Sequence, residues 1–198
     1  MPVRAWRVRL VRGPAAIVAG AVLVAGCAAG PGASKGGKTA NMAASTPGTT
    51  VFTGASAPRV PAVSGNRLGG GTLNLASYRG HAVVLNFWGS WCTVCQQEAP
   101  EFSTIARHFA GSKVQFLGVD VADSTASAHG FMKHFRIGYP SFYDPSNRIA
   151  PSFKGFIPPT AFPSTLVISP TGRIVARVIG AVSVKGLTSL IDKAASPS

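Results

Sequence analysis

The chain has 198 residues, of which 46% are hydrophobic, and its 19 lysines and arginines outnumber 6 acidic residues to give a formal net charge of +13. This hydrophobic content suits one packed domain and excludes a wholly disordered chain. No run of Lys and Arg with interleaved aromatic residues follows the basic N-terminus, so we expect no nucleic-acid partner. The excess charge predicts a solvated basic surface or attraction to anionic lipids and envelope polymers.

The first 26 residues have the pattern of a targeting signal. Four arginines between positions 4 and 12 precede an apolar run, Ala15–Ala25, which is too short for a comfortable membrane span. The run ends in Leu23-Val24-Ala25-Gly26-Cys27, which resembles a bacterial lipobox, in which the peptide is cut before a cysteine that becomes lipidated. This implies a lipoprotein signal peptide over residues 1–26 and a lipid anchor on Cys27. An ordinary secretory peptide and an uncleaved anchor are the alternatives.

Residues 27–56 are predicted to form a flexible tether. Gly, Ala, Ser, Thr and Pro dominate this stretch, and Lys35 and Lys38 are its only charges. Such a tether would let a lipid-anchored domain search the membrane surface for its partner. The folded domain is then expected over residues 57–195.

The predicted domain opens with two short extended segments, Arg59–Val63 and Thr72–Leu75. Turn-rich residues separate them, among them Ser64-Gly65-Asn66, and this spacing predicts a strand pair. The next segment, Ala82–Phe87, is apolar at nearly every position, which indicates a strand covered on both faces of a sheet.

Two cysteines, Cys92 and Cys95, follow this strand at the start of a helical segment. A cysteine at a helix N-terminus meets unpaired backbone N–H groups and the positive end of the macrodipole, which favour its thiolate. We therefore expect Cys92 to be the nucleophile and Cys95, one turn further in, to be the resolving thiol. A disulfide between them closes a very short loop, so a purely structural role is a weak explanation. Lipidation of Cys27 would leave them as the only pair.

The surrounding stretch, Asn86-Phe87-Trp88-Gly89-Ser90-Trp91-Cys92-Thr93-Val94-Cys95-Gln96-Gln97-Glu98-Ala99-Pro100, resembles the signature of the TlpA/ResA-like, membrane-tethered branch of the thioredoxin superfamily. The resemblance implies a thioredoxin-like domain that opens with a β-hairpin. Asn86 stands where cytoplasmic thioredoxins carry a buried acid. Asparagine at this position departs from those proteins and agrees with the membrane-tethered branch. Val94 departs from it, because relatives often have proline, and this leaves the direction of electron flow open.

Glu98 lies three residues after Cys95, so the two side chains share a helix face. A carboxylate near a thiol would raise the pKa of that thiol. The resemblance implies that this acid tunes the dithiol and assists proton transfer. An exposed charge on an early helical turn is the alternative.

The remaining elements alternate between helix and strand. Apolar spacing predicts a helix from the cysteines to about Phe109, which Pro100 should interrupt and kink. Later elements are expected as strands Val114–Val119, Ser141–Tyr143, Thr165–Ile168 and Arg173–Ile179, and as helices Ser124–Phe135, Ser146–Phe153 and Ser183–Ala194. This order predicts an α/β fold, a mixed sheet flanked by helices on both faces.

Pro163 lies just before a predicted strand and matches the cis-proline position of the thioredoxin family. The match implies that a cis bond places the backbone of Phe162 opposite Cys92, where an extended client segment can pair with it. An ordinary trans proline is the alternative. Trp91 is expected either to be an exposed docking surface or to pack in the core. The segment before Pro163 is longer than in typical relatives, and its residues Gly155–Ile157 are expected to widen or cap the substrate groove.

These features predict an extracytoplasmic thiol–disulfide oxidoreductase, anchored to the cell membrane through Cys27 and monomeric, with protein thiols and disulfides as clients. A reductive enzyme would keep the haem-binding cysteines of apocytochrome c reduced and would be recharged by a membrane electron donor. An oxidative enzyme would introduce disulfides into secreted proteins. No cofactor is expected, because two sulfurs suffice.

Other functions have less support. A non-catalytic lipoprotein could use the same scaffold to hold a client or a metal. A zinc site would have to combine the cysteine pair with His129 and His134, across a gap longer than in zinc fingers. Haem attachment needs a histidine where Gln96 stands, and the Pro-x-x-x-Thr-x-x-Cys motif of peroxiredoxin-like peroxidases is absent from the sequence.

Overall fold

The computed structural model describes residues 48–54 and 57–195, so the predicted signal peptide, Cys27 and most of the predicted tether lie outside the described residues. Its main sheet has six strands in the order β1-β8-β7-β4-β5-β6. The strands are β1 Thr49–Val51, β4 Ala82–Trp88, β5 Val114–Val121, β6 Ser141–Asp144, β7 Ser164–Ile168 and β8 Ile174–Ile179. The helices are α1 Thr93–His108, α2 Thr125–His134, α3 Ile149–Ser152 and α4 Val184–Ala195. A separate hairpin of β2 Ser64–Asn66 and β3 Thr72–Asn74 is followed by a 3-10 turn, η2 Leu75–Tyr78.

β4 is a central strand of the sheet, and all of its residues are buried. It pairs in parallel with β5, where Leu85 lies opposite Leu117, and antiparallel with β7, where Leu85 lies opposite Leu166. A parallel pair needs a long crossover, and α1 supplies it. The carboxyl ends of β4 and β5 therefore lie at the same edge of the sheet, and the cysteines follow the end of β4.

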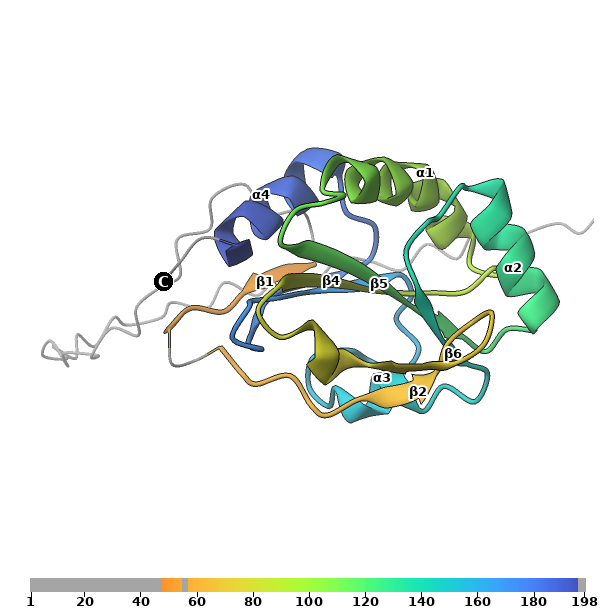
Figure 1. Cartoon of the computed structure of the whole chain (residues 1–198), viewed down its shortest axis with the longest axis horizontal. Coiled ribbons are helices and arrows are strands. Elements are labelled where there is room, and N and C mark those ends of the chain that lie inside the picture. Colours follow the sequence, from red (N-terminus) through yellow and green to blue (C-terminus); the bar gives the residue numbers. More distant parts are fainter. Residues whose placement is uncertain (1–47, 55–56, 196–198) are drawn as a thin grey trace, which may run out of the picture. The chain divides into compact units, whose positions relative to one another are not determined.

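Alternate residues of β4 point to opposite faces of the sheet, and each face carries its own apolar core. Val84 and Trp88 lie in the core beneath α1, α2 and α4, where Trp88 stacks on Phe131 with ring centroids 4.5 Å apart. Leu85 and Phe87 lie in the core of the other face, which α3 and the hairpin cover (Figure 1). The predicted mixed sheet with helices on both faces is confirmed.

α1 begins with Cys92 as its N-cap and buries Phe102 and Ile105 against the sheet, as their helical spacing predicts. The helix continues through Pro100, so the expected interruption is absent from its bounds. Proline cannot donate to the carbonyl of Gln96 four residues earlier. Because both residues are exposed, water can satisfy that carbonyl and the helix can continue.

The start of the folded part differs from the prediction. β1 lies within residues 27–56, for which the sequence predicts a tether, and it pairs antiparallel with β8, with Thr49 opposite Val178 and Val51 opposite Ala176. The predicted boundary at residue 57 is therefore wrong for Thr49–Val51. Composition could not reveal this strand, because it forms by pairing with the open edge of a strand far along the chain.

The N-terminal hairpin is present, but its first strand is displaced. The sequence predicts Arg59–Val63 as that strand, whereas the structure pairs Ser64–Asn66 with Thr72–Asn74. Gly65 lies close to the main sheet, since a Cβ at this position would be 3.4 Å from the ring of Phe142. An added Cβ would be at ordinary contact distance there, so the hairpin is placed instead by its pairing with the main sheet, where Arg67 forms an antiparallel bridge with Phe142.

Candidate active site

Cys92 and Cys95 form a disulfide at the N-terminus of α1, with their Cα atoms 5.2 Å apart. The Cys92 side chain is 6% exposed and that of Cys95 is 1% exposed, so Cys92 is the more accessible sulfur. The Sγ of Cys92 also accepts the backbone N–H of Cys95 at 3.1 Å. After reduction, the same N–H and the helix macrodipole would stabilise a thiolate on Cys92.

Trp91 and Phe162 lie together beside the dithiol. Their rings meet edge to face, with centroids 5.8 Å apart, and the Phe162–Pro163 peptide bond is cis, as the sequence predicts. Trp91 is 51% exposed, and its indole N–H donates to the carbonyl of Val121 at 2.9 Å. It is therefore an exposed surface held in a fixed orientation.

Gly89 makes this orientation possible. A Cβ at position 89 would lie 2.5 Å from the indole nitrogen of Trp91, closer than two such atoms can approach. The indole therefore folds across a position where only glycine leaves enough room. The sequence alone gave no sign of this contact.

Glu98 is buried, with 5% of its surface exposed, so the alternative of an exposed charge is wrong. Its Oε1 accepts the side-chain N–H of Asn86 at 3.2 Å. Burial raises the pKa of Glu98 to about 7, because loss of solvation outweighs the opposing effects of the Asn86 hydrogen bond and of the nearby Val182 backbone. Near neutral pH this acid can both give and take a proton.

Sequence reasoning missed three polar residues near the dithiol. Tyr139 is buried close enough to Glu98 for that carboxylate to help raise the pKa of its phenol. Asp123 accepts the backbone N–H of Ser90 at 2.7 Å. Asp120 is fully buried, and its burial raises its pKa to about 8, with Asp123 and Asp144 adding to the rise. Of these three residues, only Asp120 could have been found from the sequence, because an acidic residue at the end of an apolar strand segment is unusual.

Exposed apolar side chains flank Cys92 along the chain, and another begins α4. Trp91 precedes Cys92, and Val94, which is 41% exposed, stands between the two cysteines. Val184, which is 42% exposed, begins α4 two residues after Val182, whose backbone contacts Glu98. Such a surface can bind an extended apolar segment of another chain.

The residues Gly155–Ile157 do not cap this surface. Ile157 is buried with Phe87 and Phe153 in the core on the opposite face of the sheet. The ring of Phe156 packs edge to face against Phe52 at 5.7 Å. The prediction that this segment widens or caps the substrate groove is therefore wrong, because its apolar residues complete the second core instead.

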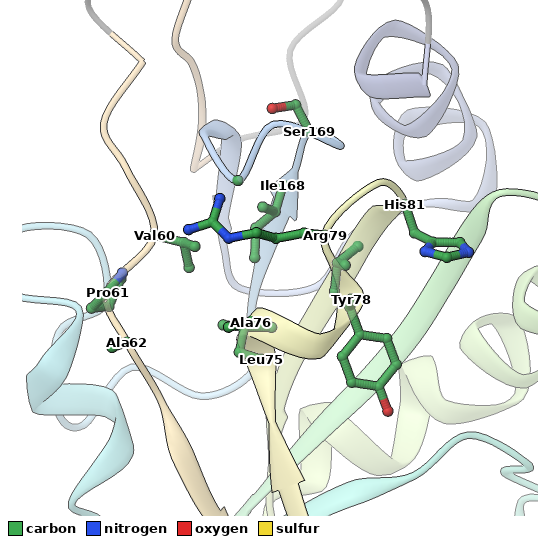
Figure 2. A pocket seen from close by; sticks show the side chains of 12 residues that line it. Val60, Pro61, Ala62, Leu75, Ala76, Tyr78, Arg79, His81, Ile168 and Ser169 are labelled. Carbon is green, nitrogen blue, oxygen red and sulfur yellow. The ribbon is translucent and has the colours of Figure 1, made fainter.

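A pocket of about 210 Å³ lies elsewhere on the domain (Figure 2). Val83, at the start of β4, lines it together with Ile168 and Arg79, and the Arg79 guanidinium donates to the carbonyl of Thr171 at 3.3 Å. Because the cysteines follow the other end of β4, this pocket is remote from the dithiol. We therefore assign the chemistry to the shallow surface around Cys92.

Residues 48–54 and 57–195 contain neither a metal-binding cluster nor a membrane-spanning helix. In that part of the chain, no group of three or more His, Cys, Asp or Glu side chains is placed to hold a metal ion. None of the helices in these ranges has the length and apolar character needed to cross a membrane.

Residues 55–177 match the sequence model of the AhpC/TSA family. The thiol-disulfide oxidoreductase ResA of Bacillus subtilis (strain 168) is 30% identical over 114 residues, which are 58% of this chain and 62% of that protein. The chain thus spans less than two thirds of this relative. The solved structure of a DsbF homologue from Corynebacterium diphtheriae is 30% identical, with a TM-score of 0.69 over 74% of this chain and 92% of that one. A secreted thiol-disulfide isomerase from Corynebacterium glutamicum is 29% identical, with a TM-score of 0.68 over 73% and 92% of the two chains.

Proposed function

Because the chain belongs to the AhpC/TSA family and has a thioredoxin-like fold, we propose that it is a thiol–disulfide oxidoreductase that exchanges disulfides with protein clients. The observation that carries this proposal is the bond between Cys92 and Cys95 at the start of α1. The names of the relatives agree with it.

The exchange proceeds in two steps. The Cys92 thiolate attacks one sulfur of a client disulfide, so that a mixed disulfide forms and the other client sulfur leaves as a thiolate. Cys95 then loses its proton and attacks the Cys92 sulfur, which releases the second client sulfur and leaves the Cys92–Cys95 disulfide. Two electrons pass from the dithiol to the client.

Glu98 is proposed to take the proton of Cys95 in the second step. It lies one turn from Cys95 on the same helix, is buried beside it, and has a pKa of about 7. Its Oε2 has no hydrogen-bond partner among the described residues, so this oxygen is available to accept a proton. Glu98 would therefore act in proton transfer at the dithiol and not in client binding.

The client is proposed to bind as an extended, apolar segment over Trp91 and Val94. The backbone of Phe162, before Pro163, would pair with it, and the contact between the Phe162 and Trp91 rings holds this side of the groove together. Such recognition is tolerant of sequence, which suits an enzyme with several clients.

The reductive direction is proposed for this enzyme, with apocytochrome c as an example of a client. An ionisable acid next to Cys95 opposes thiolate formation, and a dithiol whose reduced form is poorly stabilised gives up electrons readily. A membrane electron donor would then recharge Cys92 and Cys95. In the opposite direction, the enzyme would introduce disulfides into secreted proteins. The redox titration described below distinguishes the two directions.

An extracytoplasmic location is proposed from the secreted relative and from the N-terminal sequence pattern. Residues 1–26 would be removed, a lipid on Cys27 would anchor the protein to the cell membrane, and the residues before β1 would act as the tether of a monomeric domain. Mass spectrometry of the mature N-terminus checks the anchor, and Cys27→Ser should release the protein from the membrane.

The direction of electron flow is tested by titrating Cys92 and Cys95 against glutathione and dithiothreitol buffers. A reduction potential of about −270 mV supports the reductive direction, and one of about −120 mV would contradict it. The binding-lipoprotein alternative predicts that Cys92→Ser leaves the cellular phenotype intact, whereas an oxidoreductase loses function.

A further inference from the structure

The loop that leads into Cys92 is held by three hydrogen bonds, which we call the loop clamp. The Ser90 N–H donates to Oδ2 of Asp123 at 2.7 Å, and the Gln96 side chain donates to the Ser90 carbonyl at 2.7 Å. The indole N–H of Trp91 donates to the carbonyl of Val121 at 2.9 Å. Both polar groups of the Ser90 backbone are therefore fixed, two residues before the sulfur.

Asp120 lies beneath this clamp without any compensating charge. In the sheet register it stands between Trp88 of β4 and Tyr143 of β6, and it is 0% exposed. Neither of its carboxyl oxygens meets a donor among the described residues, whereas the Asp123 carboxylate is within reach of a proton on Asp120. Burying a charged carboxylate without a hydrogen-bond donor costs much free energy, whereas burying the neutral, protonated acid costs far less.

Burial and the two acidic neighbours of Asp120 oppose its ionisation. Asp123 approaches it from the turn after β5, and Asp144 from the end of β6. Tyr143, also on β6, donates to the Asp123 backbone carbonyl. The aromatic ring of Trp88 is its neighbour on β4, and α1 and α2 place uncharged residues such as Phe102 and Phe131 in the same core.

We propose that Asp120 is a buried carboxylic acid that donates its proton in a hydrogen bond to Asp123, and that this acid pair positions Ser90 and, through it, Cys92. Asp120 and Asp123 are positioning residues, because they act through the loop and do not touch the reacting sulfurs. When Asp120 ionises, the two carboxylates repel each other, Asp123 turns away, and the Ser90 N–H loses its acceptor. The effect of this acid pair on catalysis rests on the proposed function of Cys92. The coupling between Asp120 ionisation and the Ser90 loop does not depend on that function.

The first test follows the amide resonance of Ser90 by NMR in the oxidised full chain, in which Cys92 and Cys95 cannot titrate. In the wild type this resonance should shift with a midpoint near pH 8, because burial raises the pKa of Asp120 to about 8. Asp120→Asn, a neutral isostere of the acid, should abolish the shift. Glu98→Gln should leave it in place, and so should Asp192→Asn, a matched change on α4.

The proposal is overturned if the Ser90 resonance does not titrate in the wild type, or if Asp120→Asn keeps the titration. The wild-type curve decides this even if a variant fails to fold. The NMR experiment uses oxidised protein and measures no disulfide exchange. Its result therefore does not depend on whether the proposed function is correct.

The second test measures how fast the reduced protein attacks a small aromatic disulfide. At pH 7, Asp123→Ala should be slower by about threefold to tenfold, the equivalent of one lost hydrogen bond, and Asp120→Asn should be close to the wild type. Above pH 8.5 the wild type should fall behind Asp120→Asn. Equal rates for all three proteins at both pH values would contradict a positioning role, while a wild type that reacts no faster than Cys92→Ser would contradict the proposed function instead.

Discussion

The buried acid Glu98 makes the stability of the folded protein depend on pH, and Glu98→Gln tests the size of this effect. Burial raises the pKa of Glu98 from its ordinary value of 4.5 to about 7. Because one pKa unit corresponds to about 1.4 kcal/mol, ionisation of Glu98 destabilises the folded state by about 3 kcal/mol.

Between pH 4.5 and about 7, the unfolded chain has released the Glu98 proton while the folded chain still holds it. The contribution of Glu98 to the free energy of unfolding is therefore largest below pH 4.5, falls through this window, and levels off above about pH 7. Glutamine does not titrate. The stability of Glu98→Gln relative to the wild type should accordingly rise by about 2 to 3 kcal/mol from pH 5 to pH 8.

Urea denaturation of the oxidised proteins at several pH values from 5 to 8 measures this difference. Asp120 also titrates in this range, but it is present in both proteins and cancels in the comparison. Glu101→Gln, an exposed change on the same helix, serves as the control; Glu101 adds only the smallest contribution to the raised pKa of Glu98, so this variant should show a much weaker trend than Glu98→Gln. A constant difference between Glu98→Gln and the wild type across the range would refute the argument from burial.

Three further predictions concern the dithiol and its support. Cys92→Ser should reduce disulfide exchange to the background rate, whereas Cys95→Ser should accumulate a mixed disulfide with the client, which non-reducing electrophoresis detects. Gly89→Ala should displace the Trp91 indole and break its bond to Val121, with a loss of about 1 kcal/mol in stability and a change in tryptophan emission; unchanged emission would show that the contact is not restrictive. Leu85→Ala, at a fully buried position of β4, should lower the free energy of unfolding by about 2 to 5 kcal/mol in urea, and a smaller loss would mean that the core closes over the cavity.

The sequence predicted the elements that depend on local patterns. The strand before the cysteines, the helix after them and the strands from Val114 onward follow from apolar spacing, and each boundary moves by only a few residues in the structure. Glu98 could be placed near Cys95 because both lie on one helix, at a separation that fixes a shared face. Its burial could not be inferred, because α1 contributes only part of its surroundings.

What the sequence could not predict depends on partners distant along the chain. β1 forms by pairing with the edge strand β8, and the displaced hairpin lies where Arg67 bridges Phe142 of β6. Asp123 carries no local signal of its bond to Ser90, since the two residues meet only when β4 and β5 pair in parallel. The cap expected from Gly155–Ile157 failed for the same reason, because a second core was available to those side chains.

The two edges of the sheet bear on what an unfolded chain could do to this protein. β1 is three residues long and β6 is four, and the Leu68 N–H already occupies the Ser141 carbonyl on the outer side of β6. Short edges of this kind give a stray strand little to pair with. If clients bind as proposed, in extended form beside Phe162, the blunt edges would leave the loop before β7 as the place for backbone pairing and would limit aggregation with unfolded clients.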